Sequence, residues 1–227
     1  MVIYEQIFKA HGLSPTQQKI INLVGKNKTI LEIGPSTGYM TKFFLENGCI
    51  VDVVESQKEA IRKLPKKIRK VFNRSIEEKN IQHFLNKDYE FIIMADVLEH
   101  LVSPADVLKT LKKISTLNTK LLISLPNMAC WTMRKQLFFK GDFEYTDSGL
   151  LDKTHLHFYT TNTLPKLLRE IGWEVKDVIG TVLRLPFEGS LKKIPIFGWM
   201  FQKWMYQGLA IKYKNLSYYH FMVIASK

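Results

Sequence analysis

The stretch from Ile30 to Met40, ILEIGPSTGYM, constrains the fold of this chain more than any other. Its apolar residues predict a buried strand over 29–33, followed by a turn that contains Gly34 and Gly38 and then by a helix. Glycine has no Cβ and adopts positive φ easily, so such a loop lets backbone N–H groups and a helix N-terminus approach a ligand. The stretch therefore predicts a ligand-binding strand, loop and helix.

The spacing of the glycines argues against a dinucleotide ligand. A dinucleotide fingerprint has the form GxGxxG, in which the third glycine lets the helix pack closely on the strand. Here the three positions are Gly34, Ser36 and Tyr39, so two of the glycines are missing. The next apolar run, IVDVVE, predicts a second strand that presents Glu55 to ribose hydroxyls. The pattern predicts a nucleoside without a pyrophosphate; an ordinary strand–turn–helix corner is the alternative.

The composition suits one α/β domain with an ample core. The chain has 227 residues, of which 46% are hydrophobic. Its two cysteines, Cys49 and Cys130, lie far apart, which excludes a disulfide framework and a zinc site of cysteines. The N-terminus has no signal-peptide pattern, and no stretch offers the roughly 18 apolar residues of a membrane span. We therefore expect a soluble, cytoplasmic protein.

The net charge of +12 favours anionic partners, namely nucleic acid, phosphorylated substrates or anionic lipid. One basic cluster covers residues 58–79, and another covers residues 184–214, where Glu188 is the only carboxylate. For the first cluster, a solvated helix and turn is favoured over a binding patch. The stretch 194–211 has a helical apolar stripe. A lid or core-covering helix is favoured there, and a membrane-surface helix is the alternative.

Strands and helices are predicted to alternate along the rest of the chain. A helix break is predicted at residues 12–15, and Pro104 is predicted to open a helix. Further helices are predicted over 39–47 and 57–64, and further strands over 50–54, 69–72, 91–95, 121–125 and 218–226.

The segment after the predicted strand 91–95 resembles a motif of one protein family. Asp96 to Leu101, DVLEHL, followed by Pro104, is similar to the segment after strand four in many small-molecule class I S-adenosylmethionine (SAM) methyltransferases, including ubiquinone-biosynthesis O-methyltransferases. The glycine loop and Glu55 resemble the nucleoside-binding half of the same family. A nucleic-acid amino-methyltransferase would show an Asp/Asn-Pro-Pro-aromatic turn at this point, and this chain has none.

Residues 126–160 carry the closest resemblance. Pro-Asn, Trp131, GDF at 141–143, YTD at 145–147, LDKTH at 151–155 and FYT at 158–160 look like methyltransferases encoded with surface-polysaccharide and O-antigen assembly. The resemblance spans 29–180 and returns at 218–226. It implies one methyltransferase domain over 1–227: a Rossmann-like, seven-stranded mixed sheet with the last strand antiparallel and helices on both faces. Residues 1–28 would be a helical lead-in, and 126–160 and 181–217 insertions over the active site.

The resemblance implies SAM as the cofactor, with S-adenosylhomocysteine as the product. Gly34, Ser36 and Gly38 would hold the methionine end and Glu55 the ribose. At the adenine position this chain has Ser75 in place of an acidic residue, with Ile76 beside it to cover the ring. His100 would orient a loop, and a general base is its alternative role. The full set of predicted cofactor-binding residues is Glu32, Gly34, Ser36, Gly38, Glu55, Ser56, Ser75, Ile76, Ala95, Asp96 and His100.

His155 is the first candidate for the general base, or for the group that orients the acceptor hydroxyl, because imidazole titrates near neutral pH. Asp152 would fix its ring, and His157, on the same face of an extended segment, is the second candidate. The alternative is that these histidines hold loop carbonyls. Asp152, His155 and His157 could also bind a metal, but no fourth ligand is evident and transfer from a sulfonium requires none. We therefore predict no metal site.

The predicted activity is methyl transfer from SAM to a hydroxyl of a small molecule or glycan intermediate, in polysaccharide biosynthesis. A SAM-binding scaffold or regulator without its own chemistry is the alternative. A basic RNA methyltransferase is disfavoured because only the charge supports it, so nucleic acid is not the expected partner. Peripheral contact with the anionic inner face of a membrane would suit a lipid-linked acceptor. The sequence leaves the acceptor atom and the oligomeric state open.

Overall fold

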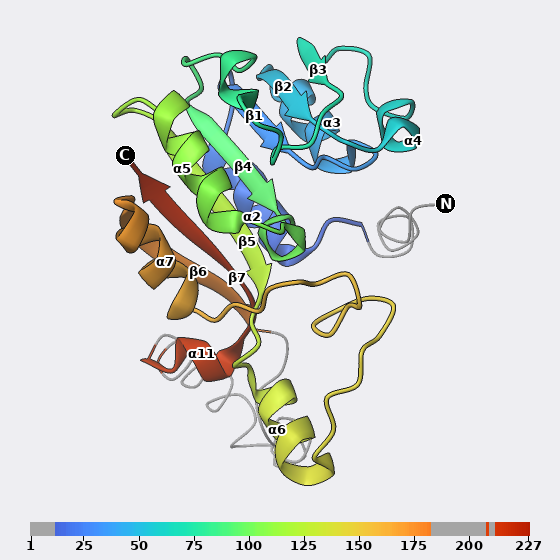
Figure 1. Cartoon of the computed structure of the whole chain (residues 1–227), viewed down its shortest axis with the longest axis vertical. Coiled ribbons are helices and arrows are strands. Elements are labelled where there is room, and N and C mark those ends of the chain that lie inside the picture. The colour runs from blue at the N-terminus through green and yellow to red at the C-terminus, as the bar shows by residue number, and fades with distance from the viewer. Residues whose placement is uncertain (1–11, 183–207, 209–211) are drawn as a thin grey trace, which may run out of the picture.

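A computed structural model describes residues 12–182, 208 and 212–227 (Figure 1). The described helices are α2 (Pro15–Val24), α3 (Tyr39–Glu46), α4 (Lys58–Ile61), α5 (Pro104–Ile114), α6 (Trp131–Lys140), α7 (Thr163–Ile171) and α11 (Lys214–Ser217), with the 3₁₀ helices η1 (Ile81–His83) and η2 (Leu98–His100). The strands are β1 (Thr29–Ile33), β2 (Ile50–Val54), β3 (Lys70–Phe72), β4 (Phe91–Ala95), β5 (Lys120–Pro126), β6 (Glu174–Val182) and β7 (Tyr218–Ser226).

The strands form one seven-stranded sheet in the order β3-β2-β1-β4-β5-β7-β6. The first five strands in this order pair in parallel, and β7 runs antiparallel between β5 and β6. The predicted Rossmann-like α/β fold with an antiparallel last strand is therefore confirmed. Because the carboxyl ends of β1, β2, β4 and β5 meet at one edge, the loops after them form the ligand-binding edge of the sheet.

Side chains that alternate along each strand divide the core into two layers. On one face, Ile30 packs in a cluster with Ile20 of α2 and Phe44 of α3. On the other face, Leu31 packs in a cluster with Leu108 of α5 and Leu164 of α7. Helices thus cover both faces of the sheet, as predicted. The loops after β1 and β4 lie at the carboxyl edge of the sheet, beyond these two helical layers.

The boundaries of the helices and strands agree closely with those predicted from the sequence, with one clear exception. The helix predicted over 57–64 extends only from Lys58 to Ile61. Pro65 accounts for the difference, because a proline disfavours the helical conformation of the residue before it and lacks a backbone N–H. In α2, Ser14 caps the helix N-terminus through the N–H of Gln17, which places the start of the helix at the predicted break.

Helix α6 and the loop that follows it lie beyond the carboxyl end of β5 (Figure 1). They belong to the segment 126–160 that we predicted as an insertion on the substrate side. Most of the second predicted insertion, 181–217, and the apolar stripe at 194–211, apart from Gly208, lie outside the described residues, as do residues 1–11. Among the described residues, the helices are too short or too polar to cross a membrane.

Candidate active site

The loop between β1 and α3 has the backbone geometry of a ligand cradle. Gly34 and Gly38 have φ angles of 65° and 77°, and Ser36 also has a positive φ of 54°. A Cβ on Gly34 would lie 2.7 Å from Cγ2 of Val97, so a side chain at this position collides with a stiff neighbour. The loop is therefore restricted to glycine at Gly34 by backbone conformation and by space.

Glu55 lies beside this loop, at the carboxyl end of β2. Its Oε2 accepts a hydrogen bond from the Ser36 N–H at 3.1 Å, and its Oε1 accepts one from the Gln57 N–H at 2.9 Å. The carboxylate is 7% exposed. Each carboxylate oxygen has more than one lone pair, so both oxygens keep acceptor capacity for ribose hydroxyls. The structure thus brings Glu55 and Ser36 together, as the predicted nucleoside site requires.

The side chain of Glu32 is buried more deeply than we expected for a residue that contacts the cofactor directly. Its side chain is 2% exposed, and its Oε2 accepts a hydrogen bond of 2.6 Å from the hydroxyl of Thr41 in α3. Burial raises the pKa of the Glu32 carboxyl to about 7, against the smaller opposing effect of the Thr41 hydrogen bond. Glu32 therefore joins β1 to α3 beneath the loop and changes protonation near neutral pH.

The residues predicted for the adenine follow β3. Ser75 is exposed, and its hydroxyl accepts a hydrogen bond from the Glu77 N–H at 3.2 Å. Ile76 is 5% exposed and packs in the core, which leaves its backbone for contact with the base. Ser56 is exposed directly after Glu55.

Ala95 ends β4, and Asp96 follows it with a positive φ of 56°. The Asp96 N–H donates to the Ser124 carbonyl of β5 at 3.0 Å, and its Oδ1 lies 2.6 Å from Nε2 of His220 at the start of β7. His220 was not among the predicted residues. The pair holds the Asp96 carboxylate at the edge of the sheet, next to the glycine loop.

A cavity of about 390 Å³ opens beside Asp96. This volume lies in the range of small-molecule sites, roughly 300–1,000 Å³. The cavity lies next to the glycine loop, since Tyr39 at the start of α3 contributes to its wall. Its described lining residues are Gly12 to Gln17, Tyr39, Asp96, Glu99, Pro126, Gly149, Leu150, His155, Thr181, Tyr219 and His220.

The loop between α6 and α7 brings His155 to this cavity. His155 is 6% exposed, and its Nδ1 lies 3.3 Å from the Leu150 carbonyl. Asp152 forms a tight turn, in which its Oδ1 accepts from the N–H and the hydroxyl of Thr154 at 2.8 and 2.7 Å. Burial lowers the pKa of His155, and the neighbouring His100 lowers it further. The ring is therefore neutral at pH 7.

The ring of His157 lies near a different carbonyl from that of His155. It is half-buried, is absent from the described lining of the cavity, and its Nε2 lies 3.4 Å from the Val102 carbonyl. Both histidines do line a second, smaller pocket together with Glu99 and Phe158. The shared face that we predicted for them therefore stays a prediction, and His155 also lines the larger cavity.

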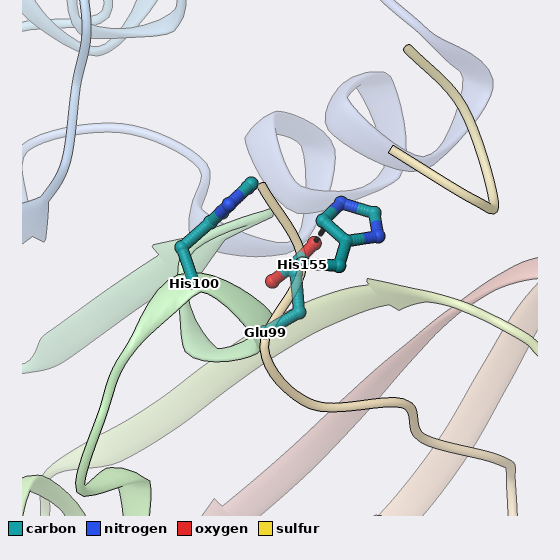
Figure 2. Close-up of side chains that lie close together, drawn as sticks. All are labelled: Glu99, His100 and His155. Atoms are coloured by element: carbon teal, nitrogen blue, oxygen red, sulfur yellow. Dashed lines mark ion pairs between the residues drawn. The ribbon is translucent and has the colours of Figure 1, made fainter. Parts of the chain in front are cut away.

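Glu99 and His100 of η2 meet His155 at the edge of the cavity (Figure 2). Glu99 is 2% exposed, and its Oε1 lies 3.9 Å from Nε2 of His155. The rings of His100 and His155 contact edge to face, with 4.8 Å between centroids. Nδ1 of His100 lies 3.1 Å from both the carbonyl and the hydroxyl of Thr154. Burial raises the pKa of Glu99 well above its usual range, and the charge of Asp96 raises it further.

Comparison with protein families identifies the family to which this chain belongs. The profile of a methyltransferase-domain family matches residues 8–178, about three quarters of the chain. The chain belongs to the methyltransferase-domain family. It is a SAM-dependent methyltransferase with the class I fold, so the cofactor that the family resemblance implied is confirmed. No curated protein sequence matches the chain.

Solved structures support the same fold for the methyltransferase. A SAM-dependent methyltransferase from Archaeoglobus fulgidus is 16% identical, with 99% of each chain covered and a TM-score of 0.63. A possible histamine N-methyltransferase from Thermotoga maritima is 15% identical, with coverages of 99% and 94% and a TM-score of 0.66. The 1,6-didemethyltoxoflavin-N1-methyltransferase of Burkholderia thailandensis, solved with S-adenosylhomocysteine, is 14% identical, with coverages of 94% and 76% and a TM-score of 0.55.

Sequence reasoning missed the residues that β7 contributes to the methyltransferase cavity. Tyr219 and His220 both line it. A signal for them was available, because an antiparallel strand places its first residues at the edge where the parallel strands end. Glu99 lies inside the motif that carried the resemblance, but its burial beside His155 depends on the fold of the loop 141–162.

Proposed function

We propose that this methyltransferase transfers the methyl group of SAM to a hydroxyl oxygen of a small molecule or glycan intermediate. One observation carries the proposal: the 390 Å³ cavity brings Asp96, Glu99 and His155 together beside the glycine loop. A hydroxyl is a poor nucleophile at neutral pH, so its methylation benefits from a proton acceptor and an orienting group near the reacting atoms. A SAM-binding scaffold would not need these groups.

The cofactor would lie across the carboxyl ends of β1, β2 and β4. Gly34, Ser36 and Gly38 would hold its methionine end through backbone N–H groups and the N-terminus of α3. Glu55 would accept hydrogen bonds from the ribose hydroxyls, since its carboxylate is already held by the N–H groups of Ser36 and Gln57. This placement directs the methyl group toward Asp96 and the cavity.

The chemical step is an in-line displacement. The acceptor oxygen forms a bond to the methyl carbon, the carbon–sulfur bond breaks, and its electron pair stays on the sulfur of S-adenosylhomocysteine. The hydroxyl proton passes to the Asp96 carboxylate, which His220 holds in place. His155 is buried, with Nδ1 toward the Leu150 carbonyl, so we assign it the orienting role at the far side of the acceptor. Most of the acceleration comes from holding donor and acceptor at reaction distance.

The acceptor class follows from the resemblance of residues 126–160 to methyltransferases of surface-polysaccharide assembly. A lipid-linked glycan would bring the enzyme to an anionic membrane. Helix α6 supports this partner, because it exposes Leu137, Phe138 and Phe139 by 46%, 83% and 69% between basic residues Arg134, Lys135 and Lys140. Exposed aromatic residues beside cations suit an anionic lipid surface.

Flotation with anionic and neutral vesicles tests the membrane contact. A Phe138→Ser/Phe139→Ser double variant should lose binding to anionic vesicles, whereas Leu117→Ser, which changes a leucine that is 83% exposed elsewhere on the surface, should retain it. Absence of the wild-type protein from the floating fraction at low salt would contradict the contact.

Turnover with isotope-labelled SAM tests the reaction. The protein is incubated with nucleotide-linked sugars, lipid-linked glycans, small aromatic alcohols and amines, and RNA, and the methylated atom is located by mass spectrometry. We expect methyl ethers of a hydroxyl acceptor. His155→Ala should lower the rate about 100-fold, because the acceptor loses its orienting group, while the calorimetric affinity for SAM stays unchanged. Methylation of nitrogen, of RNA, or of no acceptor would contradict the proposal.

A further inference from the structure

We infer that Glu99, His100 and His155 form a binding site for a divalent transition-metal cation of the Zn²⁺ class. One potential ligand atom from each of the three side chains lies within 4.8 Å of the other two (Figure 2). Two imidazoles and one carboxylate are a ligand set that Zn²⁺ takes when it keeps an open coordination position. This set differs from Asp152, His155 and His157, the three residues that the sequence analysis considered as possible metal ligands.

The Glu99 carboxylate provides the first argument. It is 2% exposed, and neither Oε1 nor Oε2 has a hydrogen-bond partner. A buried carboxylate is strongly unfavourable unless it is protonated, hydrogen-bonded or bound to a cation. The backbone carbonyl of Glu99 accepts from the N–H groups of Leu156 and His157 at 2.8 and 3.0 Å. The backbone carbonyl is therefore satisfied, whereas the carboxylate, next to two imidazoles, has no hydrogen-bond partner.

The orientation of the histidines provides the second argument. Nδ1 of His155 lies 3.3 Å from the Leu150 carbonyl, and Nδ1 of His100 lies 3.1 Å from the Thr154 carbonyl. A carbonyl accepts only from a protonated nitrogen, so both rings carry their proton on Nδ1 and leave Nε2 with a free lone pair. A backbone carbonyl at the second ring nitrogen is a usual arrangement for metal-bound histidines.

The distances suit a cation after a small adjustment. Zn²⁺ bonds nitrogen and carboxylate oxygen at about 2.0–2.2 Å, so two ligand atoms on one tetrahedral ion lie about 3.4 Å apart. Nε2 of His155 and Oε1 of Glu99 are separated by 3.9 Å. All the ligand atoms of the set lie within 4.8 Å of one another, so the side chains would have to move together slightly to hold an ion. Mg²⁺ is disfavoured because it prefers oxygen ligands.

The position of the site gives the cation a role that rests on the proposed function. Glu99 and His155 both line the cavity, so a cation that they hold would be within reach of an acceptor bound there. A bound cation lowers the pKa of a hydroxyl that coordinates it. The proton of such a hydroxyl would pass to Asp96 as its oxygen bonds to the methyl carbon of SAM and the carbon–sulfur bond breaks, with the electron pair left on sulfur. In this arrangement His155 orients the acceptor through the cation.

Metal binding can be measured without turnover. Untagged protein is stripped with a chelator and titrated with Zn²⁺ against a chromophoric competitor, and Co²⁺ is added separately to record its visible absorption. We expect one Zn²⁺ per chain, a tetrahedral Co²⁺ spectrum, and at least tenfold weaker binding in Glu99→Gln and His155→Ala. His83→Ala, which changes an exposed histidine in η1, should bind like the wild type. Unchanged SAM affinity in each variant confirms that it is folded.

Two results would overturn the site: no Zn²⁺ bound to the wild type beyond what the Glu99→Gln variant binds, or equal affinity in all variants. A Glu99 carboxyl that is simply protonated beside His155 predicts the first of these results. The role in catalysis fails separately if Zn²⁺ binds but the stripped protein methylates its acceptor at the full rate. Binding without any O-methylation would refute the proposed function and leave the metal site standing.

Discussion

Nε2 of His220 lies 2.6 Å from Oδ1 of Asp96, although the two residues are separated by 124 positions in the chain. Strand β7 pairs with β5, and β5 pairs with β4, so the start of β7 meets the end of β4. His220→Ala removes the hydrogen bond that holds the Asp96 carboxylate. Loss of a hydrogen bond to a charged group costs about 1.5–3 kcal/mol, and we expect turnover to fall roughly 10- to 100-fold.

His220→Gln retains an N–H donor and should recover part of this loss. The measurement is the rate of methyl transfer at saturating SAM, together with the affinity for SAM by calorimetry. If His220→Ala and His220→Gln lose the same activity, the hydrogen bond to Asp96 is not the reason, and packing of the ring in the cavity wall explains the effect.

Gly34→Ala should abolish SAM binding. An alanine at this position must adopt a φ of 65° and place its Cβ 2.7 Å from Val97. The left-handed conformation alone costs about 1–2 kcal/mol, and the collision displaces the loop that carries Ser36. Calorimetric titration with S-adenosylhomocysteine measures the loss.

Gly141→Ala is the matched control for this variant. Gly141 has a φ of 68°, but a Cβ there meets no atom within 4 Å. It should lose a similar conformational free energy while its affinity for the cofactor stays intact. Equal affinities in the two variants would contradict the assignment of the loop.

Glu55→Ala should weaken SAM binding by about 1–3 kcal/mol, because it removes the carboxylate assigned to the ribose hydroxyls. Glu59→Ala, which changes an exposed carboxylate in the neighbouring helix α4, should bind SAM normally. Isothermal titration of both variants, with adenosine as a second ligand, checks this prediction. An effect on SAM without an effect on adenosine would place Glu55 at the methionine end instead.

Glu32 makes stability depend on pH. Its pKa is raised by burial to about 7 in the folded protein, from 4.5 as its ordinary value. A carboxyl with a raised pKa stabilises the fold while it is protonated. Its contribution is therefore fully present below pH 4.5 and is lost as pH rises through 7. From pH 5 to pH 8 the wild type should lose about 2–3 kcal/mol of unfolding free energy relative to Glu32→Gln.

Urea unfolding at the two pH values measures this difference. The glutamine keeps an oxygen for the Thr41 hydroxyl, so the comparison isolates the charge. Glu46→Gln, which changes an exposed carboxylate at the end of the same helix, should show no such dependence. A constant difference between wild type and Glu32→Gln across the range would refute the raised pKa.

Local patterns predicted the fold well, because each strand carries its own signal. The strands β1, β2 and β4 are short apolar runs, and Gly34 and Gly38 mark the turn to α3 by a rule of backbone conformation. The cavity beside Asp96 was less predictable, since it is made by contacts between distant segments. Nothing near His220 in the sequence indicates Asp96, and the turn at Asp152 decides which histidine faces the cavity. Glu32 was predicted as a ligand contact, but the depth of its side chain depends on how α3 packs.

Strand β7 is the last strand in the chain, yet it lies between β5 and β6. During synthesis, residues 29–126 complete the five parallel strands and the glycine loop before β7 exists. The half of the molecule that we assign to SAM can therefore form on the nascent chain, while β6 still lacks its neighbour and Tyr219 and His220 are missing from the cavity wall. The ribosome thus makes the residues that we assign to the donor before the two residues of β7 that complete the cavity wall.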